Sequence, residues 1–319
     1  MSKTTFVRDI TGNQHEVNDL FVVTKKGTYT AKNNTKYMMV GLKDATGSID
    51  GRIWERVDEL EGLFEKGDIV SVRSKARLYQ DRLQLHITDI RKLDADLAVC
   101  DIAHFYPCGD KERGLLQEEY AAIVKEIKNP HLKELLNTFT GDRQLLDRYF
   151  SYPASTSVHH VYVGGLLEHS LSVAKLGMAA ASLIGGDRDI IVTGCILHDI
   201  GKVHELDILR GFKFTDRGRL LGHITLGVMI LEDLIRRTDG FPQDLTDILT
   251  HIVVSHHGLE EWGSPKKPMF PEAIIVHHLD NLDSKVMGVR EHMKDNMADE
   301  RWSDYHRLYE AKYYKITSE

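Results

Sequence analysis

The 319-residue sequence contains only three cysteines, Cys100, Cys108 and Cys195. Their number is odd and their spacing is not that of paired zinc ligands, which argues against a disulfide framework and against a thiolate zinc site. Long apolar runs are also absent. No stretch of about 18 apolar residues occurs, and the N-terminal residues lack the apolar segment of a secretory signal. We therefore expect a globular protein of the cytoplasm with no membrane partner.

An excess of positive charge is lacking as well, because 48 Asp and Glu outnumber 41 Lys and Arg and give a net charge of -7. This value argues against a protein that binds nucleic acid over its whole surface, although a local basic groove is compatible with it. Residues 1–95 hold 16 Lys and Arg against 14 Asp and Glu, so the acidity lies in the rest of the chain. Of the 17 histidines, only His15 and His86 precede residue 100. This skew is a first indication of a metal site in the C-terminal two-thirds.

The sequence predicts a multidomain α+β protein with an N-terminal barrel over 1–95, a helical connecting region over 96–150 and an all-α domain over 151–319. Strand patterns near 19–30, 37–42 and 48–54 are followed by a short helical pattern over 55–64. Two more strand patterns follow over 69–78 and 83–87. Three strands, a helix and two strands give the order of a small five-stranded Greek-key barrel. From residue 155 onward, long segments with helical periodicity replace the strand patterns.

The barrel segment carries two turn signals, Asp44-Ala45-Thr46-Gly47 and Lys66-Gly67-Asp68. With these turns it resembles the OB-fold nucleic-acid-binding family, in its tRNA-anticodon-binding-like branch, over roughly residues 15–95. The resemblance implies that a single strand lies across the second and third strands of the barrel. The candidate contacts are basic and aromatic side chains of this region: Lys25, Lys26, Lys32, Lys36, Tyr37, Trp54, Tyr79 and Arg82, with Tyr29 as a further stacking face. The alternative is that Tyr37 and Trp54 are barrel core and the lysines a solvated rim.

The chemistry is expected from a set of histidines and aspartates. His198-Asp199 ends an apolar helical run, where burying the pair alone would be costly and a metal ion would remove that cost. Because adjacent helical residues point about 100° apart, Asp199 is well placed to reach two ions with its two oxygens. Further polar residues lie in or beside apolar helical segments, namely His169, His223, His256-His257 and Asp280. One shared site explains these residues better than separate core histidines do.

This ordered set resembles the HD superfamily in its binuclear form over about residues 155–290. The resemblance implies that one ion is held by His169, His198, Asp199 and Asp280. A second ion would be held by Asp199, His223 and His256, with His257 replacing or supplementing His256. Lys202, in the sequence His-Asp-Ile-Gly-Lys, matches a phosphate-contacting lysine, so Asp199 and Lys202 are the catalytic candidates. The resemblance implies two divalent ions, Mn²⁺ first, whereas the ligand chemistry alone also suits Fe, Co or Zn.

The barrel followed by the segment from His159-His160 to His169 is similar to the YhaM-like 3′-to-5′ exoribonucleases over nearly the whole chain. This similarity implies metal-dependent trimming of single-stranded RNA, with single-stranded DNA as a second candidate substrate. It also implies that His159 and His160 contact substrate phosphates, and the alternative for this pair is a surface position at a helix N-terminus. Two other functions stay open. One is an HD-type nucleotidase or cyclic-nucleotide phosphodiesterase whose barrel is a scaffold, and the other is a non-catalytic nucleic-acid-binding protein with a structural metal centre.

Overall fold

The structure divides the chain into two units. The computed structural model describes residues 3–80, 82–93, 102–109, 111–156, 160–208, 211–299 and 301–316. The first unit comprises Met1–Cys108 and Asp207–Lys213, and the second comprises Gly109–Leu206 and Phe214–Glu319. The predicted connecting region 96–150 thus contributes its helices to the second unit.

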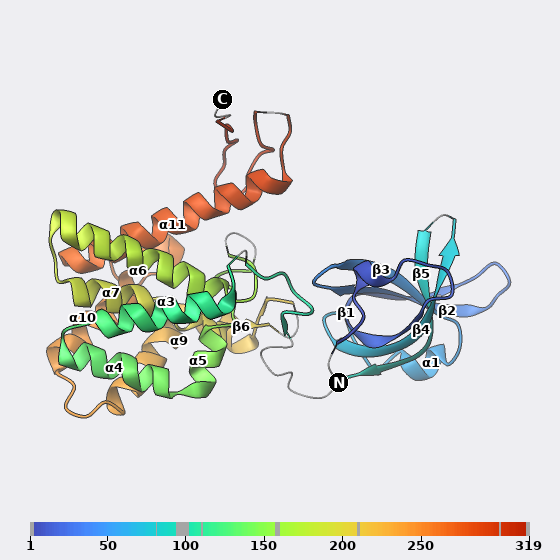
Figure 1. Ribbon diagram of the computed structural model, residues 1–319, viewed down its shortest axis with the longest axis horizontal. Coiled ribbons are helices and arrows are strands. Elements are labelled where there is room, and N and C mark those ends of the chain that lie inside the picture. Colours follow the sequence, from blue (N-terminus) through green and yellow to red (C-terminus); the bar gives the residue numbers. More distant parts are fainter. Residues whose placement is uncertain are drawn as a thin grey trace. The chain divides into compact units, whose positions relative to one another are not determined.

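The first unit is built on a closed barrel in the strand order β1-β2-β3-β5-β4 (Figure 1). Strands β3 and β5 pair in parallel, and the other neighbouring strands are antiparallel. The elements are η1 (Val7–Asp9), β1 (Glu16–Thr30), β2 (Lys36–Asp44), β3 (Gly47–Ile53), α1 (Val57–Leu60), β4 (Ile69–Tyr79) and β5 (Arg82–Lys92). The predicted five-stranded barrel, with its helix between the third and fourth strands, is confirmed.

The barrel follows from the alternation of its strands. In β4, Val70, Val72 and Ala76 point into the apolar core, and the residues between Val72 and Ala76 alternate between outward and inward positions. Between β2 and β3, the Asp44 carboxylate accepts hydrogen bonds from the Thr46 amide at 2.8 Å and from its hydroxyl at 2.7 Å. Such local bonds from an aspartate side chain stabilise tight turns.

Helix α1 is shorter than predicted, because the helical pattern over 55–64 yields only Val57–Leu60. Arg56, which precedes the helix, has a left-handed backbone with φ of 57°. Beyond the helix, the Lys26 ammonium binds the carbonyl oxygens of Glu61 and Phe64, the latter at 2.7 Å. These carbonyls are therefore satisfied by a side chain from β1 and do not need further helical turns.

The second unit is helical. It begins with α3 (Arg113–Glu126), α4 (Pro130–Gly141) and α5 (Arg143–Tyr149). The break predicted at Asn129-Pro130 separates α3 from α4, and the Asn129 side chain caps α4. The remaining elements of this unit are α6 (Gly165–Ile184), α7 (Arg188–Leu197), α8 (Lys202–Glu205), α9 (Asp216–Arg236), α10 (Gln243–Ser255), η2 (Glu260–Trp262) and α11 (Pro271–Asp295). Between α8 and α9 in the chain, β6 (Leu206–Asp207) and β7 (Lys213–Phe214) form a two-stranded ribbon, of which Asp207 and Lys213 belong to the first unit.

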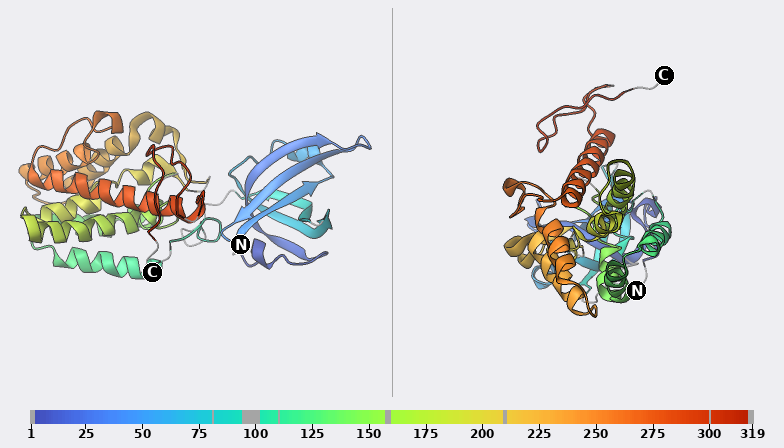
Figure 2. Two further views of the ribbon diagram at one scale, coloured as in Figure 1. Left: turned by 90° about the horizontal axis from the view of Figure 1, so that it is seen from above. Right: turned by 90° about the vertical axis from the view of Figure 1, so that its left-hand side faces the viewer.

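Helix α6 lies at the centre of this packing. It contacts α7 on one side and α11 on another, and α9 packs against both α8 and α10 (Figures 1 and 2). The buried faces of α6 and α7 carry the histidine and aspartate residues together with apolar side chains. Within the described residues, no helix combines the length and the apolar character needed to cross a bilayer.

Candidate metal centre and nucleic-acid interface

His169 comes from the buried face of α6. Its ring is fully buried and shares this face with Leu166 and Val173, as the helical spacing predicts. Nδ1 lies 2.8 Å from Oδ2 of Asp283 on α11. A proton on Nδ1 therefore faces the carboxylate, which leaves Nε2 to face the interior of the bundle.

His198 and Asp199 follow the last turn of α7. His198 Nδ1 donates to the carbonyl oxygen of Cys195 at 2.8 Å, so its Nε2 also points inward. Asp199 is 1% exposed. Its two carboxylate oxygens face different sets of histidines, as the two-ion hypothesis requires.

The first set joins His169, His198, Asp199 and Asp280. Nε2 of His169 lies 3.3 Å from Nε2 of His198 and 3.2 Å from Oδ1 of Asp280. Oδ2 of Asp199 lies 3.6 Å and 3.4 Å from the same two ring nitrogens. Ligand atoms that share one ion at bonds of about 2.1 Å lie about 3–4 Å apart. The structure therefore brings the two histidines to the separations from Asp199 and Asp280 that a single ion would need.

The second set gathers around Oδ1 of Asp199. Nε2 of His223 and Nε2 of His256 each lie 3.6 Å from this oxygen. His257 belongs to the same cluster, in which one potential ligand atom of each residue lies within 4.8 Å of the others. Its Nδ1 donates to the Trp262 carbonyl oxygen at 2.5 Å. Both histidines of the pair therefore reach the cluster.

Three buried atoms of the second set lack hydrogen-bond partners: Oδ1 of Asp199, Nε2 of His223 and Nε2 of His256. Unsatisfied polar atoms are rare in protein interiors and call for a specific explanation. Here they face one another, and all three are ligand types of divalent transition metals. The residues present therefore fit a metal ion at this position.

The backbone around Gly201 and Gly222 positions His223. Gly222 has φ of 70° and interrupts α9, which places the His223 amide 2.9 Å and its Nδ1 3.1 Å from Oε1 of Glu205. A Cβ atom on Gly201 would lie 1.9 Å from the His223 carbonyl oxygen. This contact requires glycine, since any side chain would push α9 away from Asp199.

We expect Gly201→Ala to destabilise the protein by about 1–3 kcal/mol and to weaken metal binding at the second set, because the added methyl group overpacks the contact. Thermal unfolding and metal content measured by mass spectrometry check this result. Gly114→Ala is the matched control, since a Cβ at Gly114 in α3 meets nothing within 4 Å. If the two alanine variants have the same melting temperature and metal content, the contact at Gly201 has no part in shaping the site.

The surroundings of the cluster lower the pKa values of its two aspartates, Asp199 and Asp280, and of His257. Burial by itself would raise the pKa of Asp199, but Lys202 and His198 hold it well below its usual range. Burial likewise opposes ionisation of Asp280, yet His169 and His198 lower its pKa. Burial lowers the pKa of His257 to about 4, which keeps this ring neutral and able to ligate a metal at neutral pH.

Lys202 lies close to the candidate ligands, as its position three residues after Asp199 predicts. Its ammonium lies 2.5 Å from Oδ2 of Asp199, and the residue is only 9% exposed. It is therefore neither extended into solvent nor far from the ligands. The same ammonium also lines a cavity beside the cluster, where it can meet an anion.

Of the predicted pair His159-His160, the structure describes only His160, because His159 lies outside the described residues. His160 differs from both expectations, since it is 1% exposed and is not a surface residue. Its Nε2 lies 3.2 Å from Oδ2 of Asp283 and its Nδ1 lies 2.6 Å from the Tyr162 hydroxyl. It thus sits behind His169, where it orients the carboxylate that holds the His169 ring.

Sequence reasoning missed Asp283 and Glu205 as supports of the ligands. Each contacts the Nδ1 of a candidate ligand, Asp283 that of His169 and Glu205 that of His223. Asp283 lies one helical turn after Asp280 in α11, and Glu205 lies one turn after Lys202 in α8. Their position three residues after another site residue, on the same face of a helix, was the signal in the sequence that could have identified them.

On the barrel, three aromatic rings form a continuous strip. Tyr37 stacks on Trp54 with ring centroids 4.8 Å apart, and Tyr29 lies 5.8 Å from Tyr37. Arg52, which the sequence interpretation missed, lies 5.6 Å from the Tyr37 ring centroid and 5.1 Å from that of Tyr79. Tyr37 and Trp54 are half-buried and lie outside the described apolar core of the barrel. The alternative that they fill the core is wrong.

The four lysines of the barrel fall into two groups. Lys25 and Lys32 are exposed, as is Arg82 at the start of β5. Lys26 is occupied by the carbonyl groups beyond α1 and by Glu65 at 3.0 Å, and Lys36 pairs with Asp58 and with Glu61. These ion pairs neutralise Lys26 and Lys36, which makes Lys25, Lys32 and Arg52 the better candidates for phosphate contacts.

Comparisons with known proteins agree with this two-part organisation. Residues 166–285 match the HD domain family, and residues 21–93 match the OB-fold nucleic acid binding domain family. The chain therefore carries an N-terminal OB-fold followed by a helical region with an HD domain. This combination is consistent with a YhaM-like architecture, and HD domains bind divalent metals.

Several solved structures resemble parts of the chain. The p204 HINb domain is 18% identical over 28% of this chain, with a TM-score of 0.24, and the match spans about half of that chain, 47%. The mitochondrial single-stranded DNA binding protein Rim1 from S. cerevisiae is 17% identical over 27% of this chain and 100% of its own, with a TM-score of 0.23. The HD domain of the L. monocytogenes phosphodiesterase PgpH is 22% identical over 50% of this chain and 74% of its own, with a TM-score of 0.28.

Proposed function

We propose that this protein is a metal-dependent 3′-to-5′ exonuclease that hydrolyses phosphodiester bonds of single-stranded RNA, with single-stranded DNA as a second substrate. The observation that carries the proposal is the pair of ligand sets that share Asp199, with three buried and unsatisfied ligand atoms in one of them. The OB-fold and its aromatic strip supply a surface suited to single strands.

In this proposal one ion is held by His169, His198, Asp199 and Asp280, and the other by Asp199, His223 and His256 or His257. Such a pair of divalent ions, Mn²⁺ as the resemblance implies, supplies an activated water and stabilises the negative charge of a phosphodiester under attack. The chain itself fixes each histidine through its Nδ1 and keeps Asp199 ionised beside Lys202. Lys202 adds positive charge on the side where the cavity opens.

A comparison of 3′-labelled with 5′-labelled oligonucleotides tests the direction of hydrolysis. The 3′ label is expected to appear at once as a mononucleotide, whereas the 5′ label passes through a ladder of shortened strands. The assay is run with Mn²⁺, Fe²⁺, Co²⁺, Zn²⁺ or EDTA, on RNA and on DNA of one sequence. Turnover of mononucleotides or cyclic nucleotides without shortening of oligonucleotides would instead favour the nucleotidase or phosphodiesterase function, and binding without turnover would favour the non-catalytic one.

The barrel strip is tested separately by Tyr37→Ala. Since stacking of a base on an aromatic ring contributes about 1–3 kcal/mol, we expect the affinity for a long single strand to fall by about 5- to 150-fold. Fluorescence anisotropy with a labelled oligonucleotide measures this change. Leu63→Ala is the control, because Leu63 is exposed on the same unit but lies outside the strip. Equal affinities for the two variants would show that the strip does not bind the strand.

A further inference from the structure

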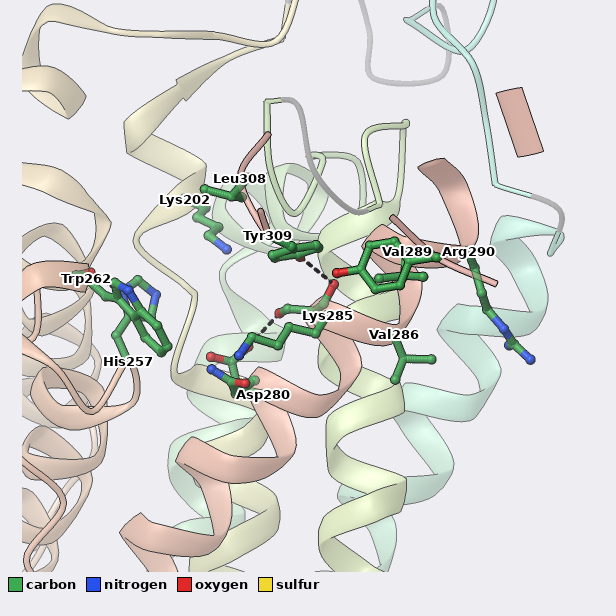
Figure 3. Close-up of a pocket in the computed structure, with 13 residues that line it drawn as sticks. Lys202, His257, Trp262, Asp280, Lys285, Val286, Val289, Arg290, Leu308 and Tyr309 are labelled. Atoms are coloured by element: carbon green, nitrogen blue, oxygen red, sulfur yellow. Dashed lines mark hydrogen bonds between the residues drawn. The ribbon is translucent and has the colours of Figure 1, made fainter. Parts of the chain in front are cut away.

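A cavity of about 820 Å³ adjoins the ligand sets in the helical unit (Figure 3). Its volume falls within the range of about 300–1,000 Å³ typical of small-molecule sites. Lys202, His257 and Asp280 connect the cavity to the candidate metal centre. The rest of its wall comes from three parts of the chain, namely Trp262 of η2, the α11 residues Asn281, Ser284, Lys285, Val286, Val289 and Arg290, and the C-terminal residues Leu308, Tyr309 and Tyr313.

Two aromatic rings, those of Tyr309 and Trp262, belong to this wall. Tyr309 stacks on His306 with ring centroids 4.4 Å apart and an interplanar angle of 12°, and its hydroxyl donates to the Ser284 carbonyl oxygen at 3.4 Å. His306 thus covers one face of the Tyr309 ring, and Tyr309 is one of the residues that line the cavity (Figure 3). Trp262, which lies beside His257 in Figure 3, is 45% exposed. Its carbonyl oxygen is the acceptor of the His257 ring, so its position is tied to the metal centre.

The charged groups of the wall are mostly cationic. Lys202, Lys285 and Arg290 are the cationic side chains of the wall, and Asp280 contributes its one carboxylate. The Lys285 ammonium lies 5.5 Å from the Trp262 ring centroid. The charges of Lys285 and Arg290, together with the aromatic rings of Trp262 and Tyr309, suit a ligand that is anionic and carries a flat ring system.

We propose that this cavity is a nucleotide-binding subsite for the end of the strand. Trp262 and Tyr309 offer stacking faces for bases, and Lys285 and Arg290 contact phosphates. The inference rests on the proposed nuclease function and extends it. It assigns a substrate-binding role to the segment 301–316, which follows the HD match and supplies part of the wall. Base recognition here would be tolerant of sequence, because every base has a face that can stack.

Binding of adenosine and of adenosine 5′-monophosphate separates the roles of the side chains. We expect Trp262→Ala and Tyr309→Ala to weaken both ligands by about 5- to 150-fold. Lys285→Gln is expected to weaken only the monophosphate, because adenosine carries no charge for the ammonium to meet. Calorimetric titration gives these constants, and the KM for oligonucleotides is expected to rise in the same variants.

Two substitutions serve as matched controls. Tyr305→Ala changes an exposed tyrosine of the same C-terminal segment, and Leu259→Ala changes an exposed residue beside η2, both outside the cavity wall. If the Trp262 and Tyr309 variants bind both ligands as tightly as these controls while the protein shortens oligonucleotides, the subsite is overturned and the nuclease function stands. If the expected binding losses occur in a protein that cleaves no oligonucleotide with any metal, the subsite stands as a nucleotide site and the nuclease function fails.

Discussion

Asp199→Ala is expected to abolish hydrolysis and to lower the metal content of the protein, because Asp199 is the one residue that belongs to both ligand sets. Its Oδ2 faces His169 and His198, and its Oδ1 faces His223 and His256. Removing the carboxylate deletes a ligand from each set at once. Mass spectrometry of the purified variant gives the metal content, and the oligonucleotide assay gives the rate.

Two further variants separate the loss of metal ligation from other effects of the Asp199→Ala substitution. Loss of Asp199 also leaves the Lys202 ammonium without its partner, and breaking a buried pair costs about 3–5 kcal/mol. Asp199→Asn keeps the shape and one potential oxygen ligand, so it separates lost ligation from lost folding. Asp244→Ala, at an exposed aspartate in the first turn of α10, is the control for the loss of one negative charge away from the ligand sets. Full metal stoichiometry in Asp199→Ala would contradict the assignment of Asp199 as a bridge between the two sets.

Lys202→Ala is expected to lower kcat/KM by about 10²–10³-fold while both ions stay bound. The ammonium cannot itself ligate a cation, but it lies at the junction of the ligand sets and the cavity. Its charge is therefore available to a phosphate oxygen as negative charge develops there. Steady-state kinetics on oligonucleotides, with metal analysis of the same sample, check this expectation.

The contact with Asp199 gives Lys202 a second role to distinguish. If the lysine mainly holds the carboxylate in place, its removal will lower the metal content, and Lys202→Met will behave like Lys202→Ala. If it mainly meets the phosphate, Lys202→Arg will recover part of the rate without any change in metal content, since both side chains carry a positive charge. Normal metal content with a normal kcat/KM in Lys202→Ala would exclude both roles.

The sequence predicted the fold well where local signals were strong. The strand order, the turn at Asp44 and the break before Pro130 all come from short patterns that act within a few residues. The ligand residues could be proposed because each lies in an apolar helical segment, where a polar group needs a partner. The structure brings together His169 of α6, His198 at the end of α7 and Asp280 of α11.

What the sequence could not provide were the long-range partners that decide what each side chain does. The Lys26 ammonium donates hydrogen bonds to the carbonyl oxygens of Glu61 and Phe64, which come 35 and 38 residues later in the chain. The His160 ring contacts the carboxylate of Asp283, which comes 123 residues later. Arg52 was missed because its contacts with Tyr37 and Tyr79 depend on the pairing of strands. Residues after α11 carried no motif, so their place in the wall of the cavity could be seen only in the fold.

The hydrogen bonds made by Nδ1 have a further consequence for how the centre is loaded and unloaded. The rings of His198, His256 and His257 are each held by a main-chain carbonyl oxygen, and those of His169 and His223 by carboxylates. The ring orientations are thus set by the polypeptide and do not depend on the ion. Small zinc domains, in contrast, unfold when a chelator removes their metal. We therefore expect that a chelator would remove a bound ion while the fold persists, and that the metal available in the surroundings would determine which element the centre carries.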